Sequence, residues 1–281
     1  MSYARTAIAT LLLSTAVAAP AWAAQSAPSA GSAPSSSAQA ALDAAVAGSW
    51  RSPSNRARDV YRHPAATLAF FGVQPGQTVI EIVPGGGWYS EILGPLLNDH
   101  GQYVAAVFKP TSAGGERSLA AFKQKFAADP AHYGKARIVE IDATAPVLGA
   151  AGSADRVLTF RNVHNWTDDD NAAVMFKAFF TVLKPGGVLG VVDHRAGAGG
   201  TTKETGYLRT EDVVKLATDA GFKLEGSSEI NANPKDTKDY PKGVWTLPPT
   251  YALGEQDKAK YQAIGESDRM TLRFVKPASA P

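Results

Sequence analysis

Two histidines and a run of glycines are the residues of this chain whose types and spacing best suit chemistry. His164 and His194 carry imidazoles that titrate near neutral pH, so either could take a proton from a substrate. Pro84-Gly85-Gly86-Gly87 follows a run of β-branched residues and precedes an apolar, helix-like stretch. Glycines at such a junction let a ligand approach the backbone, and a helix N-terminus favours negative charge there. We therefore expect a ligand-binding loop at 84–87.

The glycine spacing argues against two common nucleotide-binding motifs. A dinucleotide fingerprint needs a further glycine where Ser90 stands, and an acid at the end of the second strand, where Val107 and Phe108 stand. A phosphate-binding P-loop needs a Gly-Lys-Ser/Thr sequence, which does not follow the glycines. NAD, FAD and a P-loop nucleotide are therefore disfavoured.

The elements that must position these residues alternate between strand and helix, which indicates βαβ units and a mostly parallel, doubly wound sheet. Hydrophobic runs predict strands at 78–83, 103–108, 137–141, 155–160, 188–192, 222–230 and 269–276. Periodic apolar residues predict helices at 54–71, 88–97, 119–127, 167–183 and 210–220, with Thr167 to Asp170 as an N-terminal capping box.

Parallel strands end at one edge of a sheet, where ligands of open α/β folds bind. The predicted strand ends bring Glu81, Phe108, Asp142, Asn162 with His164, and Asp193 with His194 to that edge. Each also has a plain structural interpretation, such as a hydrogen-bonded core histidine or an asparagine that caps its strand. Tyr61, Arg62 and His63 on the leading helix could close over the same cleft, or simply pack there.

A metal site is the weaker interpretation of these side chains. Asp142, His164, Asp193 and His194 carry the right ligand types, but they show neither an HExxH motif nor comparable spacing. We therefore predict no metal.

The segment from Val79 to Gly87 resembles the first motif of class I S-adenosylmethionine-dependent methyltransferases, in which glycines at alternate positions follow an acid. Glu81 matches the acid, Gly85 and Gly87 match the second and third glycines, and Val83 stands where the first is found. Three further segments are similar to the family's fourth strand, its turn into the fifth strand and its adenine-side acid: 155–158, 183–188 and Asp142-Ala143. With 231–237 and 243–249, the pattern is similar to exported bacterial proteins called predicted methyltransferases.

The resemblance implies a Rossmann-like, seven-stranded sheet with an antiparallel last strand, and S-adenosylmethionine as cofactor. It implies that Glu81 orders the loop and approaches the methionine amino group. The family's acid at the end of the second strand, which holds the ribose hydroxyls, is replaced here by Val107 or Phe108. The expected cofactor-binding residues are Glu81, Pro84, Gly85, Gly86, Gly87, Phe108, Asp142 and Asn162.

The chain is predicted to have three parts. Residues 1–23 carry Arg5, a short apolar run and Ala21-Trp22-Ala23, which together predict a secretory signal peptide. Residues 24–47, rich in Ala, Ser and Pro, predict a flexible linker. Residues 48–281 form the methyltransferase-like domain, in which the polar, Pro-rich 231–252 predicts a lid-like loop. We expect an exported, periplasmic protein without a membrane anchor after cleavage.

Composition narrows the partners. The net charge is +2 without a Lys/Arg stripe, which argues against nucleic acid, and the absence of cysteine removes thiolate chemistry and disulfides. The sequence does not predict the oligomeric state. Three functions stay open: a methyltransferase for a small acceptor with His164 or His194 as base, an exported non-catalytic protein that binds a small ligand on the same scaffold, and a hydrolase or isomerase that uses both histidines.

Overall fold

The computed structural model describes residues 36–197, 200 and 204–278, and seven strands of this part form one sheet. The strand order is β3-β2-β1-β4-β5-β7-β6, in which β7 is antiparallel to both neighbours and the other pairs are parallel. This confirms the predicted fold class. The strands are β1 (Thr78–Ile82), β2 (Gln102–Phe108), β3 (Arg137–Ile141), β4 (Ala154–Phe160), β5 (Leu183–His194), β6 (Lys223–Ser228) and β7 (Arg269–Val275).

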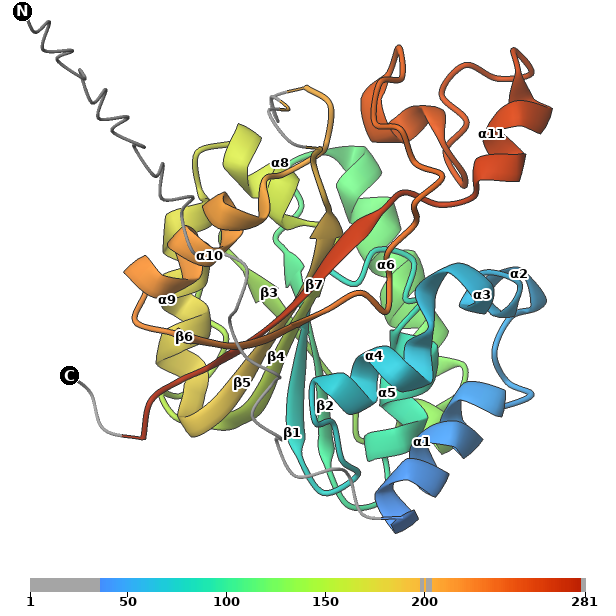
Figure 1. Ribbon diagram of the computed structural model, residues 1–281. Coiled ribbons are helices and arrows are strands. Elements are labelled where there is room, and N and C mark those ends of the chain that lie inside the picture. The colour runs from blue at the N-terminus through green and yellow to red at the C-terminus, as the bar shows by residue number, and fades with distance from the viewer. Residues whose placement is uncertain (1–35, 198–199, 201–203, 279–281) are drawn as a thin grey trace, which may run out of the picture.

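Helices cover both faces of the sheet, so the molecule has three layers (Figure 1). The first face carries α1 (Ser36–Ala47), α2 (Pro53–Arg56), α3 (Asp59–Arg62), α4 (Pro64–Phe70), α5 (Ser90–Leu97), α6 (Ala113–Ala127) and α7 (Pro130–Tyr133). The second carries α8 (Val163–Asp168), α9 (Ala172–Val182) and α10 (Thr210–Asp219). The connection between β6 and β7 holds η1 (Gly243–Thr246), which lies beside His164, and α11 (Lys258–Ile264), whose end lies near Tyr61 of α3.

Each face of the sheet has its own hydrophobic core, because side chains alternate along a strand. In β1, Ile80 and Ile82 pack into the core beneath α9, whereas Val79 packs into the core beneath α5. The charged Glu81 lies on the Val79 side by the same alternation. The hydrophobic effect therefore fixes which way the last residues of β1 point, and with them the glycine loop that follows.

The predicted flexible linker is wrong in its second half. Residues 36–47 form α1, in which Ala38, Leu42 and Ala45 are buried against α4 and α5. These positions share one helix face by their spacing of four and three residues. Residues 24–35, like the predicted signal peptide at 1–23, lie outside the described residues.

Two predicted helices also differ from the structure. The helix at 54–71 is broken into α2, α3 and α4, because His63 adopts a left-handed φ of 41° before Pro64, which begins α4. The capping box at Thr167 does not begin a helix: those residues end α8, and α9 starts at Ala172 after the left-handed Asp170.

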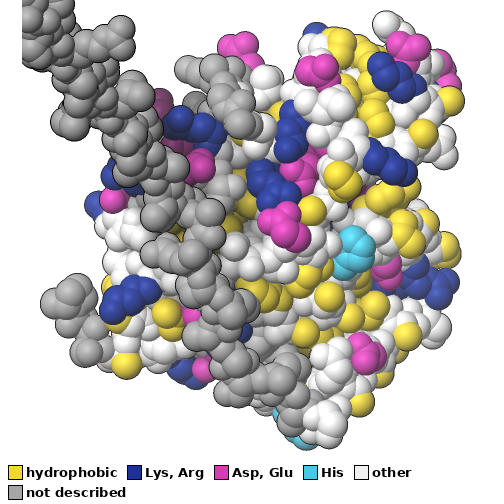
Figure 2. All heavy atoms as spheres, viewed as in Figure 1, with side chains coloured by type: hydrophobic (Ala, Val, Ile, Leu, Met, Phe, Trp, Pro, Cys, Tyr) yellow, Lys and Arg dark blue, Asp and Glu magenta, His cyan; other side chains and the backbone are white. Residues whose placement is uncertain are grey.

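Surface charge and helix length are unremarkable over the described part of the chain. Figure 2 shows basic and acidic side chains next to one another on the face that it presents, without a continuous stripe of one sign. No described helix has the length and hydropathy that crossing a bilayer requires.

The burial of α1 leads to a stability prediction. Leu42 is 1% exposed, so Leu42→Ala is expected to lower the free energy of unfolding by roughly 2–4 kcal/mol through lost burial and a cavity. Leu224→Ala, at a side chain 44% exposed on β6, is the matched control and is expected to cost about 1 kcal/mol or less. Urea denaturation measures both. Equal losses would mean that α1 does not contribute to the core.

Candidate active site at the ends of β1, β4 and β5

The loop after β1 has three left-handed residues at alternate positions. Val83, Gly85 and Gly87 have φ angles of 48°, 58° and 80°. Val83 adopts this conformation although a β-branched residue rarely does so. The left-handed backbone therefore begins one residue before Pro84, at the position where the sequence resemblance expected a glycine.

The outer surface of this loop is open. A Cβ atom added at Gly85 or Gly86 would find no atom within 4 Å, so a ligand can approach the backbone there. At Gly87 an added Cβ would lie 3.2 Å from the ring of Phe122, which packs beneath the loop. The loop is thus supported from one side and free on the other, as the backbone of a binding site requires.

The loop borders a cavity of about 210 Å³ at the switch point between β1 and β4. Its other walls are the N-terminal helices α2 and α3 and the end of β4. This position, beyond the carboxyl ends of parallel strands, is where open α/β sheets bind ligands. The lining includes Arg58, Arg62, Pro84, Gly85, Arg161 and Asn162.

Glu81 is placed behind the loop and is not part of the cavity wall. Its carboxylate is 2% exposed and accepts hydrogen bonds from the hydroxyls of Ser90 and Tyr103. Ser90 is the first residue of α5, so Glu81 fixes where the helix leaves the loop. Burial raises the pKa of Glu81 to about 7, although both hydroxyls oppose this shift. Its predicted contact with a methionine amino group stays a prediction.

Asn162 joins the end of β4 to the end of β1. Its Nδ2 atom donates to the carbonyl of Ile82 at 2.9 Å and to Thr159 Oγ1 at 3.3 Å, while the residue also lines the cavity. The structure therefore supports both interpretations of Asn162, as a brace between strands and as a residue within reach of a ligand.

The two predicted catalytic histidines lie side by side, with ring centroids 5.0 Å apart. His164 Nδ1 lies 2.8 Å from Asp193 Oδ1, and the other carboxylate oxygen accepts the backbone N–H of Val163 at 2.8 Å. Because Asp193 is fully buried, this arrangement favours a proton on Nδ1 of His164 and leaves its Nε2 as the free acceptor. The carboxylate thus orients the imidazole.

His194 is held in a different way. Its Nδ1 shares a hydrogen bond with Ser267 Oγ. Burial, with the charges of His164 and Arg161 adding to it, lowers the pKa of His194 well below its usual value, so the ring is neutral at pH 7. A neutral ring beside an oriented His164 suits a hydrogen-bonding role better than a charged one.

His164, Asp193 and His194 offer ligand atoms within 4.8 Å of one another, and Asp142 is not part of that group. Both Nδ1 atoms and both Asp193 oxygens already have hydrogen-bond partners within the protein. These hydrogen bonds hold the three side chains in place, and they occupy Nδ1 but not Nε2 of the two imidazoles.

Phe108 and Asp142 lie at the ends of β2 and β3 and do not line the cavity. Phe108 packs against the core beneath α9. Asp142 is exposed and accepts hydrogen bonds from the backbone N–H and the hydroxyl of Thr144, at 2.8 and 2.7 Å. The structure thus brings the loop, Asn162 and the histidines to one region and leaves these two predicted residues at its side.

The predicted lid-like segment 231–252 is fastened to the domain. Asp236 is 5% exposed and accepts hydrogen bonds from the hydroxyl of Tyr207 and the backbone N–H of Asp268. Trp245 lies edge-on to His164, with ring centroids 6.1 Å apart. The segment therefore packs beside the histidine pair through Trp245.

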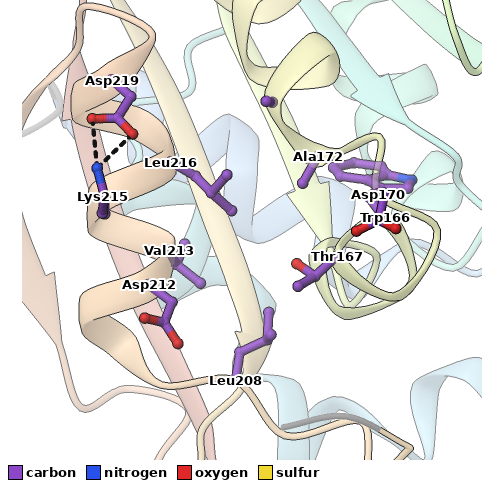
Figure 3. A pocket seen from close by; sticks show the side chains of 11 residues that line it. Trp166, Thr167, Asp170, Ala172, Leu208, Asp212, Val213, Lys215, Leu216 and Asp219 are labelled. Atoms are coloured by element: carbon purple, nitrogen blue, oxygen red, sulfur yellow. Dashed lines mark hydrogen bonds and ion pairs between the residues drawn. The ribbon is translucent and has the colours of Figure 1, made fainter.

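A second cavity of about 350 Å³ lies between α8 and α10, as Figure 3 shows. Its lining includes Trp166, Thr167, Leu208, Leu216 and Asp219. None of the predicted site residues is among its lining residues. Although it is larger, it lies away from the glycine loop and does not assemble a catalytic constellation.

Sequence reasoning missed part of the arginine cluster. Arg58, Arg161 and Arg269 come from three distant segments and surround Glu266 together with Arg62. Arg62 was expected near the cleft, and Arg161 belongs to the predicted strand end that also carries Asn162.

Comparison with known proteins supports the fold. No protein-family profile matches the chain, and no curated protein sequence matches it. Among solved structures, it is similar to a SAM-dependent methyltransferase from Aquifex aeolicus, at 14% identity and a TM-score of 0.55 over 85% of this chain and 98% of that one. The [4+2]-cyclase SpnF follows at 17% identity, TM-score 0.54 and coverage of 83% and 84%. The glycopeptide N-methyltransferase MtfA has 16% identity, TM-score 0.51 and coverage of 80% and 100%. The chain has the Rossmann-like fold of these proteins.

The buried Glu81 predicts a pH-dependent stability. A folded pKa of about 7, above the usual 4.5, means that the folded protein keeps a proton that the unfolded chain releases. This contribution therefore destabilises the fold progressively as pH rises from about 4.5 to about 7. Glu81→Gln should flatten that part of the stability profile, measured by urea denaturation at several pH values. An unchanged slope would mean that Glu81 is ionised throughout.

Proposed function

We propose that this protein is an exported S-adenosylmethionine-dependent methyltransferase for a small acceptor, with its site at the glycine loop. The observation that carries the proposal is the loop itself, left-handed at Val83, Gly85 and Gly87 and open above Gly85 and Gly86. The fold shared with solved methyltransferases supports it. Export rests on the predicted signal peptide.

The glycine loop and Asn162 fit S-adenosylmethionine, whereas the end of β2 does not offer the expected acid. The backbone of 84–87 forms a cradle that any Cβ at Gly85 or Gly86 would fill, and Asn162 lies beside it. At the end of β2, Phe108 stands in place of ribose-binding oxygens and packs against the core beneath α9. When bound, S-adenosylmethionine would supply a methyl group on a positively charged sulfur.

The protein's own part in such a reaction is alignment and proton removal. The loop and Asn162 would hold the ligand at a fixed place beside the strand ends, and alignment is the larger contribution to a displacement reaction. His164, oriented by Asp193, would take a proton from the acceptor at Nε2. Trp245 would limit access of water to that imidazole.

The alternative is an exported non-catalytic protein that binds a small ligand on the same scaffold. Phe108 favours it, because the end of β2 lacks the acid that the resemblance leads one to expect. The similarity to a cyclase shows that this fold is not restricted to proteins named methyltransferases. The two functions differ in whether bound cofactor transfers its methyl group.

The loop can be tested by filling its open surface. Gly85→Val should abolish binding of S-adenosylmethionine and S-adenosylhomocysteine in calorimetry on the chain from residue 24, because the side chain occupies the cradle. Gly152→Val is the matched control: Gly152 has a φ of 66° and equally open surroundings, but lies in the turn before β4. Both variants should lose about 1–2 kcal/mol of stability from backbone strain. Unchanged affinity in Gly85→Val would refute the assignment.

The base can be tested separately from binding. His164→Gln should lower transfer of labelled methyl groups into periplasmic small molecules by roughly 100-fold or more, with the affinity for S-adenosylhomocysteine unchanged. Asp193→Asn should weaken activity through the orientation of His164, whereas His132→Gln, at a partly exposed pair with Asp129, should have no effect. Full activity of His164→Gln would exclude this residue as the base, and binding without any transfer in the wild type would favour the alternative.

A further inference from the structure

The cavity beside the glycine loop is strongly positive. Arg58, Arg62 and Arg161 line it, and Arg269 lies directly behind them. One carboxylate, Glu266, accepts hydrogen bonds from Arg58 Nε at 2.6 Å, Arg62 Nε at 3.2 Å and Arg269 Nη1 at 3.2 Å. Three guanidinium groups therefore share one carboxylate, and the charge of Arg161 acts on Glu266 without a direct contact.

Several nitrogens of the cluster are left for a ligand. The Nη2 atoms of Arg58 and Arg62 are buried and, within the described part of the chain, have no hydrogen-bond partner. Arg62 is 3% exposed and is one of the residues that line the cavity, where its guanidinium carbon lies 4.7 Å from the centre of the Trp88 ring. A buried donor without a partner is costly, which implies that something absent from the bare chain accepts from it.

The arginines stay charged despite their burial. Burial and the like charge of Arg161 lower the pKa of Arg62 to about 10, and burial lowers the pKa of Arg161 to about 10 as well. Although burial acts in the opposite direction, Arg62 and Arg269 lower the pKa of Glu266 to about 2. At neutral pH four guanidinium charges are opposed by Glu266 and, at Arg161, also by the buried Asp193, so the cluster keeps a net positive charge.

We propose that Arg58, Arg62 and Arg161 bind an oxyanion of the methyl acceptor, and that a dianionic phosphoryl group fits the cluster best. The planar forks of arginine match the oxygens of phosphate and carboxylate groups. The amino-acid end of S-adenosylmethionine suits the cluster less well, because its carboxylate comes with an ammonium group and its sulfur is positive. The acceptor is thus an anionic small molecule, held by its charged end against the open loop.

The inference rests on the proposed function only in identifying the bound anion as a methyl acceptor. Binding measurements test the anion site separately from the methyltransferase proposal. Inorganic phosphate is the probe, titrated by calorimetry into the chain from residue 24, alone and with saturating S-adenosylhomocysteine. We expect phosphate to bind in both cases with similar affinity, because the anion would contact the arginines of the cavity whereas the cofactor would contact its glycine loop.

Variants then assign the site. Arg161→Gln removes a guanidinium that forms no ion pair with any residue of the described part of the chain, and is expected to weaken phosphate binding roughly tenfold or more while sparing S-adenosylhomocysteine. Arg58→Gln, at a side chain 23% exposed, should act in the same direction and provides a second variant if the first does not fold. Arg137→Gln, at an exposed arginine that begins β3 at the opposite edge of the sheet, is the matched control.

Three results would overturn the inference: no phosphate binding to the wild type at millimolar concentration, equal losses in Arg161→Gln and Arg137→Gln, or displacement of S-adenosylhomocysteine by phosphate. The last result would assign the arginines to the cofactor's carboxylate. Phosphate binding with the expected losses, but without any S-adenosylhomocysteine binding, would support the anion site and refute the methyltransferase proposal.

Discussion

Asn162 Nδ2 donates to the carbonyl of Ile82, and this hydrogen bond joins the ends of β1 and β4, the two strands between which the strand order reverses. The chain leaves β1 in a left-handed conformation at Val83, next to that carbonyl. A β-branched residue holds such a conformation only where its surroundings over-determine it. The brace from β4, the packing of Val83 against the core and the anchor from Glu81 to Ser90 together do so. The open surface of the loop depends on all three.

The same edge of the sheet separates two kinds of electrostatic environment. On one side, Arg62 and Arg161 line a cavity with more positive charge than Glu266 can balance. On the other, Asp193 is fully buried but satisfied, since backbone N–H groups and His164 donate to it. Satisfied buried charge positions a side chain, whereas unsatisfied buried charge attracts a ligand. The contrast therefore supports a role of Asp193 in orienting His164 and a role of the arginines in binding a ligand.

The similarity to solved structures shows the fold alone, because identities of 14–17% do not establish the roles of individual residues. The departures from the resemblance are at Val83 and Phe108. Val83 adopts a left-handed φ although it is β-branched. The second changes the chemistry at the end of β2, because a ring replaces oxygens. The loop and the strand end therefore make separate contributions to ligand choice.

The strands, the glycine loop and the edge at which the functional side chains gather could be predicted from the sequence. These follow from local patterns: β-branched runs, glycines at a strand-to-helix junction and the rule that parallel strands end together. It also indicated that His164 and His194 would be neighbours, because they follow adjacent strands. Apolar spacing in α1 was present as well, but an Ala- and Ser-rich composition concealed it.

The pairing of the charged and hydrogen-bonding side chains follows from the folded chain and not from local sequence. Arg58 and Glu266 are separated by 208 residues, and no periodicity links them. The turn of Glu81 toward Tyr103 rather than toward the cavity depends on which face of β1 packs beneath α5. The role of Asp193 likewise depends on a histidine 29 residues away. Burial and charge pairing are properties of surroundings that distant segments build, which is why local sequence patterns could not predict them.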